Sequence, residues 1–294
     1  MLVAGGTGML GSQIVDRLLA RQLSVRVLTR DPARAHVMPG NQPEFVAGDV
    51  REPASLRDAM RGVATVISAV QGFVGSGGVT PASVDRDGNM HLIDAARSVG
   101  AAVVLISVVG AAADSPLELC RMKYTAEEYL RSSGLAWSII RATPFLETWI
   151  GLLERTAHGS GRPLVFGRGD NPINFVSVAD VATLVERVVL DASTRGGTFE
   201  IGGPEQLTLN QLASAVQRAA GRTSQPRHVP RPLLKAMSGV LRPLRPNIAR
   251  QVQAALVFDT ADLAFDRRSA PGAGPDQAQT TVSDVLKRHT AWAA

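Results

Sequence analysis

Cysteine is almost absent from this sequence of 294 residues, which contains only Cys120. A single cysteine excludes an internal disulfide framework and a cysteine-rich zinc site, and it is typical of a reducing compartment. Long apolar runs are missing too, because the longest, residues 101–109, is about half as long as a bilayer-spanning helix requires. The first residues show no basic segment, apolar segment and small-residue cleavage site in the order of a secretory signal. Together these absences predict a cytoplasmic protein.

Acidic residues are missing between Glu205 and Asp259, where eight basic residues occur. This segment therefore carries a charge of +8 and leaves −3 for the rest of a chain whose net charge is +5. Its basic residues are interleaved with prolines and leucines, and the stacking aromatics or recognition helix of a nucleic-acid surface are not evident, so no nucleic acid is expected. We predict helices with solvated charges in the basic region 218–250, with an anionic membrane surface or an acidic protein as its partner.

Hydrophobic residues make up 45% and charged residues 19% of the chain, the balance of a folded globular protein. In the first half, short apolar runs of β type alternate with segments of helical periodicity. The runs expected to form strands are residues 2–4, 24–28, 45–47, 65–70, 103–109 and 137–141. Strands and helices that alternate are joined by right-handed crossovers into a parallel sheet covered on both faces. The predicted fold class is α/β, a Rossmann-type doubly wound parallel sheet with a smaller C-terminal substrate lobe.

The pattern changes after Pro144, where the segments become shorter. A helix is expected at residues 179–190, and Thr208 and Gln211 have the spacing of a capping box that begins another. We predict a Rossmann domain at residues 1–145 and a C-terminal region at 146–294 that is interleaved with the sheet and closes over the ligand. Two glycine-containing segments, residues 75–78 and 270–278, are expected to be loops, the first of them a lid.

Three glycines, Gly5, Gly8 and Gly11, lie between the first predicted strand and the first predicted helix. At this spacing the first permits a tight turn, the second lets the backbone approach a pyrophosphate, and the third lets helix and strand pack closely. The helix N-terminus adds free N–H donors and the positive end of its dipole. A plain tight turn is the alternative interpretation. The turn predicts a dinucleotide site formed by Gly5, Thr7, Gly8, Met9, Leu10 and Gly11.

The residues that follow the second and third strands bear on the choice of dinucleotide. The second strand ends at Thr29-Arg30, where an NAD-selective site places an acidic residue on the ribose 2′-hydroxyl. A guanidinium there pairs with a 2′-phosphate and stacks on adenine, so Arg30 favours NADP, with NAD as the second option and a solvated loop charge as the alternative. Asp49 either accepts a hydrogen bond from the adenine amino group or caps the helix that follows Pro53.

Further motifs occur in a fixed order along the chain. They are Val27-Leu28-Thr29-Arg30, Gly48-Asp49-Val50, Asp85-Arg86-Asp87-Gly88-Asn89, Leu105-Ile106-Ser107, Arg141-Ala142-Thr143-Pro144-Phe145, Phe175-Val176-Ser177 and Phe199-Glu200-Ile201-Gly202-Gly203. With the glycine turn, this set resembles the short-chain dehydrogenase/reductase superfamily, and more narrowly its atypical branch of NmrA-like NAD(P)-binding proteins. The resemblance covers roughly residues 2–222 and is looser beyond them.

The resemblance implies further site residues. Val50, Ala69 and Val70 would line the cofactor, and Thr143, Pro144 and Phe145 follow the sixth strand, where the family's chain passes the nicotinamide. Lys123 would hold the cofactor's ribose and support an oxyanion by its charge, and Ser107 would contact substrate. A lysine that snorkels at the sheet edge and a plain hydroxyl at a strand end are the alternatives for these two.

One departure from the superfamily pattern concerns the proton donor. The pattern has a tyrosine four residues before the lysine, and Leu119 stands there in this chain. Tyr124, next to Lys123, is rotated about 100° around the helix and does not replace it without a shift in register. The same helix is expected to carry Glu127 on its outer side.

The expected function is that of an NADP-preferring oxidoreductase that transfers a hydride to a small electrophile such as a quinone, an enone or a carbonyl. The missing tyrosine supports an alternative, a non-catalytic NADP-binding sensor, regulator or assembly subunit. A nucleotide-sugar epimerase or dehydratase is a further alternative. The five histidines show no metal-ligand spacing, so no metal site is expected, and the oligomeric state is left open.

Overall fold

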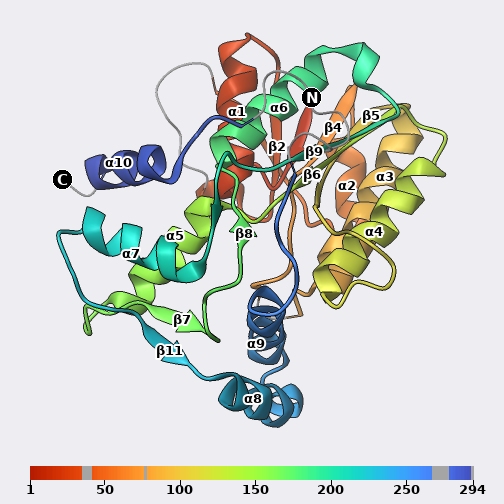
Figure 1. Ribbon diagram of the computed structural model, residues 1–294. Helices are drawn as coiled ribbons and strands as arrows, with labels where there is room; N and C mark the ends of the chain where they lie inside the picture. Colours follow the sequence, from red (N-terminus) through yellow and green to blue (C-terminus); the bar gives the residue numbers. More distant parts are fainter. Residues whose placement is uncertain (35–41, 76–77, 267–277, 293–294) are drawn as a thin grey trace. The chain divides into compact units, whose positions relative to one another are not determined.

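The computed structural model describes residues 1–34, 42–75, 78–266 and 278–292 (Figure 1). The chain forms two compact units, the first comprising Met1–Ala142 and Val181–Glu200 and the second Thr143–Asp180 and Ile201–Ala294. The boundary expected after residue 145 lies near the first crossing between the units. The chain then returns to the first unit at Val181–Glu200.

A seven-stranded sheet forms the centre of the first unit. Its order is β3-β2-β1-β4-β5-β6-β9, and the pairs from β3 to β6 are parallel. The strands are β1 (Leu2–Ala4), β2 (Arg26–Thr29), β3 (Glu44–Ala47), β4 (Thr65–Ser68), β5 (Ala102–Val108), β6 (Trp137–Ala142) and β9 (Gly197–Ile201). The strand order reverses between β1 and β4, which is the switch point where doubly wound folds bind ligands. The predicted α/β fold class is confirmed.

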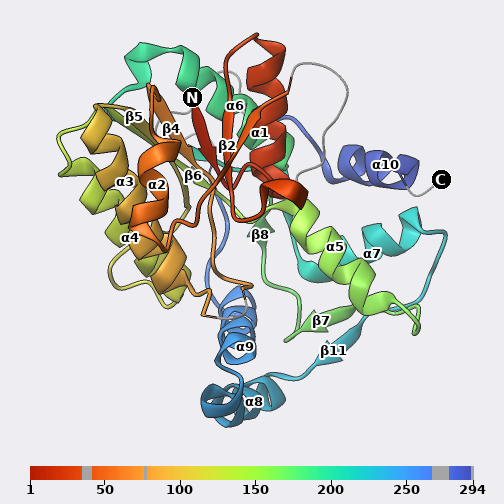
Figure 2. The same ribbon diagram turned by 180° about the vertical axis from the view of Figure 1, so that it is seen from behind.

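Helices cover both faces of this sheet. They are α1 (Met9–Ala20), α2 (Pro53–Ala59), α3 (Asp87–Val99), α4 (Glu118–Arg131) and α6 (Val178–Leu190), with short turns η1 (Pro32–Arg34), the π-helical η2 (Pro81–Arg86) and η3 (Ala192–Thr194). Figures 1 and 2 show α2, α3 and α4 on one face and α1 with α6 on the other. Arg17 and Arg21 of α1 both pair with Glu186 of α6, at 2.8 and 2.6 Å.

The core on the α2–α3–α4 face follows the helical spacing of the sequence. In α3, Leu92, Ile93 and Ala96 share one face and are buried against strand residues such as Val66 and Val103. The helix ends at Gly100, whose φ of 68° is the left-handed conformation that glycine adopts without steric cost. The helix therefore stops where β5 must begin.

The second unit combines helices with two small two-stranded sheets, β8 with β10 and β7 with β11. Its elements are α5 (Leu146–Ala157), β7 (Leu164–Phe166), β8 (Ile173–Asn174), β10 (Gln206–Leu207), α7 (Leu209–Ala219), β11 (Arg227–Val229), α8 (Arg231–Leu244), α9 (Pro246–Phe258) and α10 (Val282–Trp292). The predicted capping box is confirmed, because the Thr208 hydroxyl accepts from the Gln211 amide and the Gln211 side chain accepts from the Thr208 amide. Among the described residues, no helix is long and apolar enough to cross a membrane.

Helices α8 and α9 are attached to the rest of the second unit through Asp259. Its Oδ1 accepts from the Arg168 and Gly169 amides at 3.0 Å each, and its Oδ2 pairs with the Arg231 guanidinium at the start of α8. An added Cβ at Gly167 would lie 2.2 Å from the Asp259 carboxylate, so the loop can approach this anchor only with glycine there.

Candidate functional site at the switch point

The glycine turn lies at the carboxyl ends of β1 and β4. Gly5 has φ of +83°, and an added Cβ there would be 2.7 Å from the carbonyl oxygen of Ala69, which follows β4. At Gly11 an added Cβ would be 2.1 Å from the Gly5 carbonyl oxygen. The first glycine is thus required by a backbone contact with the segment after β4, and the third by a backbone contact within the turn.

Gly8 differs from these two glycines because it is exposed and has ordinary backbone angles, φ −83° and ψ 171°. It is the N-cap of α1 and, as a glycine, supplies no side-chain cap, and no acidic residue stands in the first turn of this helix. Thr7 and Met9 are exposed beside it, whereas Leu10 packs in the core. An exposed helix N-terminus of this kind presents N–H donors and a positive dipole end to an anion.

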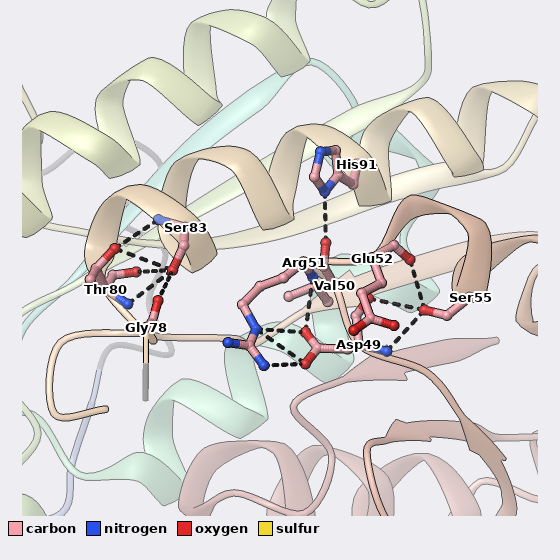
Figure 3. A network of polar contacts seen from close by, with 9 residues as sticks. All are labelled: Asp49, Val50, Arg51, Glu52, Ser55, Gly78, Thr80, Ser83 and His91. Carbon is pink, nitrogen blue, oxygen red and sulfur yellow. Dashed lines mark hydrogen bonds and ion pairs between the residues drawn. The ribbon is translucent and has the colours of Figure 1, made fainter. Parts of the chain in front are cut away.

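The predicted adenine-side residues follow β2 and β3. Arg30 is exposed and near enough to Asp49 for its charge to lower the pKa of that carboxyl. The main cause of that lowered pKa is Arg51, whose guanidinium donates to both Asp49 carboxylate oxygens, with a shortest distance of 2.6 Å. Figure 3 shows this pair beside the loop that enters α2.

Asp49 does not cap α2, because the N-cap of that helix is Glu52. The Asp49 carboxylate instead accepts from the Arg51 amide at 2.9 Å, and its backbone N–H donates to the Ser55 hydroxyl at 3.0 Å. The carbonyl oxygen of the neighbouring Val50 lies 2.8 Å from His91 Nδ1 (Figure 3). The segment after β3 is therefore ordered by local polar contacts, and the capping interpretation of Asp49 is wrong.

Lys123 of α4 is buried, with 4% of its surface exposed. Its Nζ lies 3.0 Å from the Val70 carbonyl oxygen, 2.9 Å from that of Ile106 and 3.1 Å from Asp85 Oδ1. The two carbonyls accept hydrogen bonds from the ammonium, and Asp85 pairs with its charge. In this arrangement Lys123 holds the ends of β4 and β5 together and does not snorkel toward solvent.

Asp85 connects this lysine to the chain that leaves β4. Its carboxylate is fully buried, and Oδ2 accepts from the Gly72 amide at 2.8 Å. Burial raises the pKa of Asp85 above its ordinary value, while Lys123 and the Gly72 amide oppose that rise. An added Cβ at Gly72 would lie 2.3 Å from the Thr80 carbonyl oxygen, so this segment packs tightly on η2. Residues 76 and 77 of the predicted lid lie outside the described residues.

Ser107 is also buried, at 2% exposure, and its hydroxyl donates to Glu127 Oε1 at 2.5 Å. Glu127 is fully buried, so its expected place on the outer side of α4 is wrong. It receives two hydrogen bonds from Arg141 of β6, at 2.6 and 3.0 Å, and one from Arg131 at 3.1 Å. These two arginines compensate the buried carboxylate, a requirement that the helical spacing of α4 does not reveal.

Thr143, Pro144 and Phe145 belong to the second unit, which they open. The Thr143 amide donates to the Ile201 carbonyl at 3.0 Å, and Phe145 forms a bridge with Val176. Leu119, at the place of the superfamily's tyrosine, is part-buried on α4. The described residues contain no group of three or more His, Cys, Asp and Glu side chains that could hold a metal ion.

Comparison with known proteins agrees with this geometry. The profile of the NmrA-like family matches residues 1–266. The chain belongs to the NmrA-like family. It is 29% identical over 224 residues to an NAD(P)H azoreductase from Xenophilus azovorans, covering 76% of this chain and 74% of that protein. It is 26% identical over 243 residues to the photosystem II assembly factor Ycf39 of Trieres chinensis, covering 82% and 75% respectively.

The fold is also that of a solved reductase. An NADPH-dependent quinone oxidoreductase from Escherichia coli, in complex with NADPH, superposes with a TM-score of 0.75 at 20% identity, covering 98% of this chain and 99% of that one. The resemblance drawn from the sequence motifs is thereby confirmed at the level of family and fold.

Proposed function

We propose that this NmrA-like protein is an NAD(P)H-dependent oxidoreductase that prefers NADP. The observation that carries the proposal is the turn after β1, where Gly5 and Gly11 are fixed by close backbone contacts and Gly8 leaves the N-terminus of α1 exposed without a side-chain cap. Arg30 at the end of the neighbouring strand supplies the charge that a 2′-phosphate requires.

The residues present fit a dinucleotide. Thr7, Gly8, Met9 and Leu10 would face its pyrophosphate, Arg30 its 2′-phosphate, and the Asp49–Val50 and Ala69–Val70 segments its adenosine half and the path toward the nicotinamide. When bound, the cofactor supplies a hydride. The chain itself binds and orients both reactants, and this orientation is the larger part of the protein's contribution to such a reaction.

Lys123 and Ser107 act in this proposal mainly by position. Lys123 fixes the carbonyls of Val70 and Ile106, and its buried positive charge lies next to the strand ends where an oxyanion would form. The Ser107 hydroxyl donates its hydrogen bond to Glu127, so toward a ligand it offers only an acceptor. With Leu119 at the tyrosine position, the proton added to the product comes from water.

The substrate class we favour is a small electrophile with an extended π-system, such as a quinone, an enone or another activated carbonyl. Such acceptors take a hydride without a strong acid at the site, because the resulting anion is delocalised. The names of two relatives, an azoreductase and a quinone oxidoreductase, support acceptors of this kind.

The test is NADPH oxidation by the purified full chain against a panel of quinones, enones and azo compounds. We expect turnover on at least one acceptor class and its loss in Gly8→Asp, with Lys123→Ala reduced in kcat. An absence of turnover on every acceptor, with intact NADPH binding, overturns the oxidoreductase proposal.

A second candidate function is that of a non-catalytic NADP-holding assembly subunit. Leu119 at the tyrosine position and the complete set of protein partners around Lys123 favour it, as does the relationship to the assembly factor Ycf39. Tight NADPH binding without turnover, together with a protein partner captured by the intact chain, selects this candidate.

A further inference from the structure

Helix α8 exposes an apolar stripe that none of the described residues of the second unit covers. Leu233 is 51% exposed and Val240 is 65% exposed, and these two residues lie about two helical turns apart and so share a face. Met237 lies between them and is half-buried. Leu234, by contrast, is fully buried. The helix therefore has a buried apolar face that packs within the protein and a second apolar stripe that faces solvent.

The segment that carries this stripe is basic. Lys235 on α8, Arg227 on β11 and Arg245, directly after α8, are all exposed, and Lys235 lies about 140–160° around the helix from the stripe, on its polar side. No acidic residue occurs between Glu205 and Asp259, so the charge of this part of the chain is uniformly positive. A helix with large apolar side chains exposed on one side and basic residues on its polar side has the composition of a helix that lies at a membrane interface.

The anchor at Asp259 bears on this role. By pairing with Arg231, Asp259 neutralises one of the basic residues of α8 and fixes the first turn of the helix to the Arg168–Gly169 loop. The stripe is thus presented on a helix whose start is held by several polar contacts. Less side-chain and backbone freedom remains to be lost when the helix docks on a surface.

We propose that α8 docks on the surface of an anionic lipid bilayer, with Leu233 and Val240 entering the headgroup region and the positive charge of the segment, to which Arg227, Lys235 and Arg245 contribute, attracting the anionic surface. A second copy of this chain does not suit the surface, because it would bring two uniformly basic stretches together. A nucleic acid would match the charge and leave the two large apolar side chains without a partner. The inference uses the second unit alone and does not depend on the proposed function.

The experiment is co-sedimentation of the intact protein with vesicles of phosphatidylcholine alone and of phosphatidylcholine mixed with phosphatidylglycerol. We expect binding to the mixed vesicles that high salt weakens, and little binding to the neutral ones, because each basic residue near an anionic surface contributes about fivefold to partitioning. Replacing the stripe with the double variant Leu233→Gln, Val240→Thr lowers partitioning by about tenfold or more.

The matched control is Leu190→Gln with Val99→Thr. Leu190 on α6 and Val99 on α3 are 49% and 44% exposed, and the same two substitutions there leave vesicle binding unchanged. No binding to anionic vesicles overturns the proposal and leaves an acidic protein as the partner to seek. Binding that the two double variants reduce equally also overturns it, because α8 would then have no special role. NADPH turnover is measured on the same samples, so that failure of membrane docking is distinguished from failure of the proposed function.

Discussion

Lys123 and Asp85 form a buried ion pair, with 3.1 Å between Nζ and Oδ1, that joins α4 to η2. Both side chains are almost fully buried, and the remaining donors and acceptors of the pair bind backbone at Val70, Gly72 and Ile106. The pair thus ties a helix, a π-helical turn and the ends of β4 and β5 into one unit. The lysine that the family resemblance assigns to the cofactor is therefore also a structural residue.

Replacing Lys123 with methionine leaves the Asp85 carboxylate buried without its cation. We expect a loss of about 3–5 kcal/mol in the free energy of unfolding, because a broken buried pair leaves an uncompensated charge. The double variant Lys123→Met, Asp85→Asn regains part of the lost free energy. Urea unfolding measures the free energy of unfolding of both variants. The control is Arg61→Met, whose partner Asp58 is exposed and whose loss costs less than about 1 kcal/mol. Equal effects at the two sites would contradict the structural role of the pair.

Gly8→Asp separates dinucleotide binding from stability. Asp is a favourable N-cap at these backbone angles, so the unfolding free energy stays within about 1 kcal/mol of that of the unchanged protein. The new carboxylate repels a pyrophosphate at the same N-terminus, and we expect NADPH affinity to fall by about a hundredfold or more. Fluorescence titration measures the affinity. Gly239→Asp, on α8 where an added Cβ meets nothing, is the control and binds NADPH normally. Unchanged NADPH affinity in Gly8→Asp would show that the turn is not part of the cofactor site.

Arg30→Asp tests the preference for NADP. Loss of a guanidinium that pairs with a 2′-phosphate weakens NADPH binding by about tenfold to a hundredfold. NADH binding is spared, because the new carboxylate can accept a hydrogen bond from the ribose 2′-hydroxyl of NADH. Dissociation constants for the two dinucleotides measure this. Arg222→Asp, which makes the same change of charge at an exposed position in the second unit, leaves both constants unchanged. An equal loss for NADPH and NADH in Arg30→Asp would show that Arg30 does not distinguish the two cofactors.

The sheet could be predicted from the sequence because the patterns that mark its strands lie within short stretches of the chain. Apolar runs mark the strands, and Gly11 is required by a contact with Gly5 within one turn. The predicted ends of the strands are less accurate, because the sequence predicts a strand at residues 65–70 and β4 ends at Ser68. The last residue of β1, Ala4, pairs with Ser68, and beyond it the chain turns at Gly5. The length of β4 is thus set by its neighbour.

The polar part of the site could be predicted only in outline. The sequence places Glu127 on the outer side of α4 and offers a snorkelling position as an alternative for Lys123, although both side chains are buried. Their burial depends on Asp85 and Arg141, which lie on other elements. The cost of burying a charge is offset by partners that only the tertiary fold brings near. Spacing within one helix carries no information about them.

The anchor at Asp259 gives a pH dependence of stability. Burial alone would raise the pKa of Asp259, but hydrogen bonds from Arg231 and from the Gly169 and Arg168 amides lower it below its ordinary value. A carboxyl whose folded pKa is lowered stabilises the protein above its unfolded pKa, about 4, and this contribution is lost as pH falls through the folded value. We expect Asp259→Asn to cost about 1–3 kcal/mol at neutral pH, because charged hydrogen bonds are replaced by neutral ones. The difference in unfolding free energy from the unchanged protein then narrows as the pH falls from about 6 to about 3.

Urea unfolding at a series of pH values measures this gap, with the exposed Asp58→Asn as control. A gap that stays constant over this range would mean that the Asp259 carboxylate does not titrate as the anchor of α8 and α9.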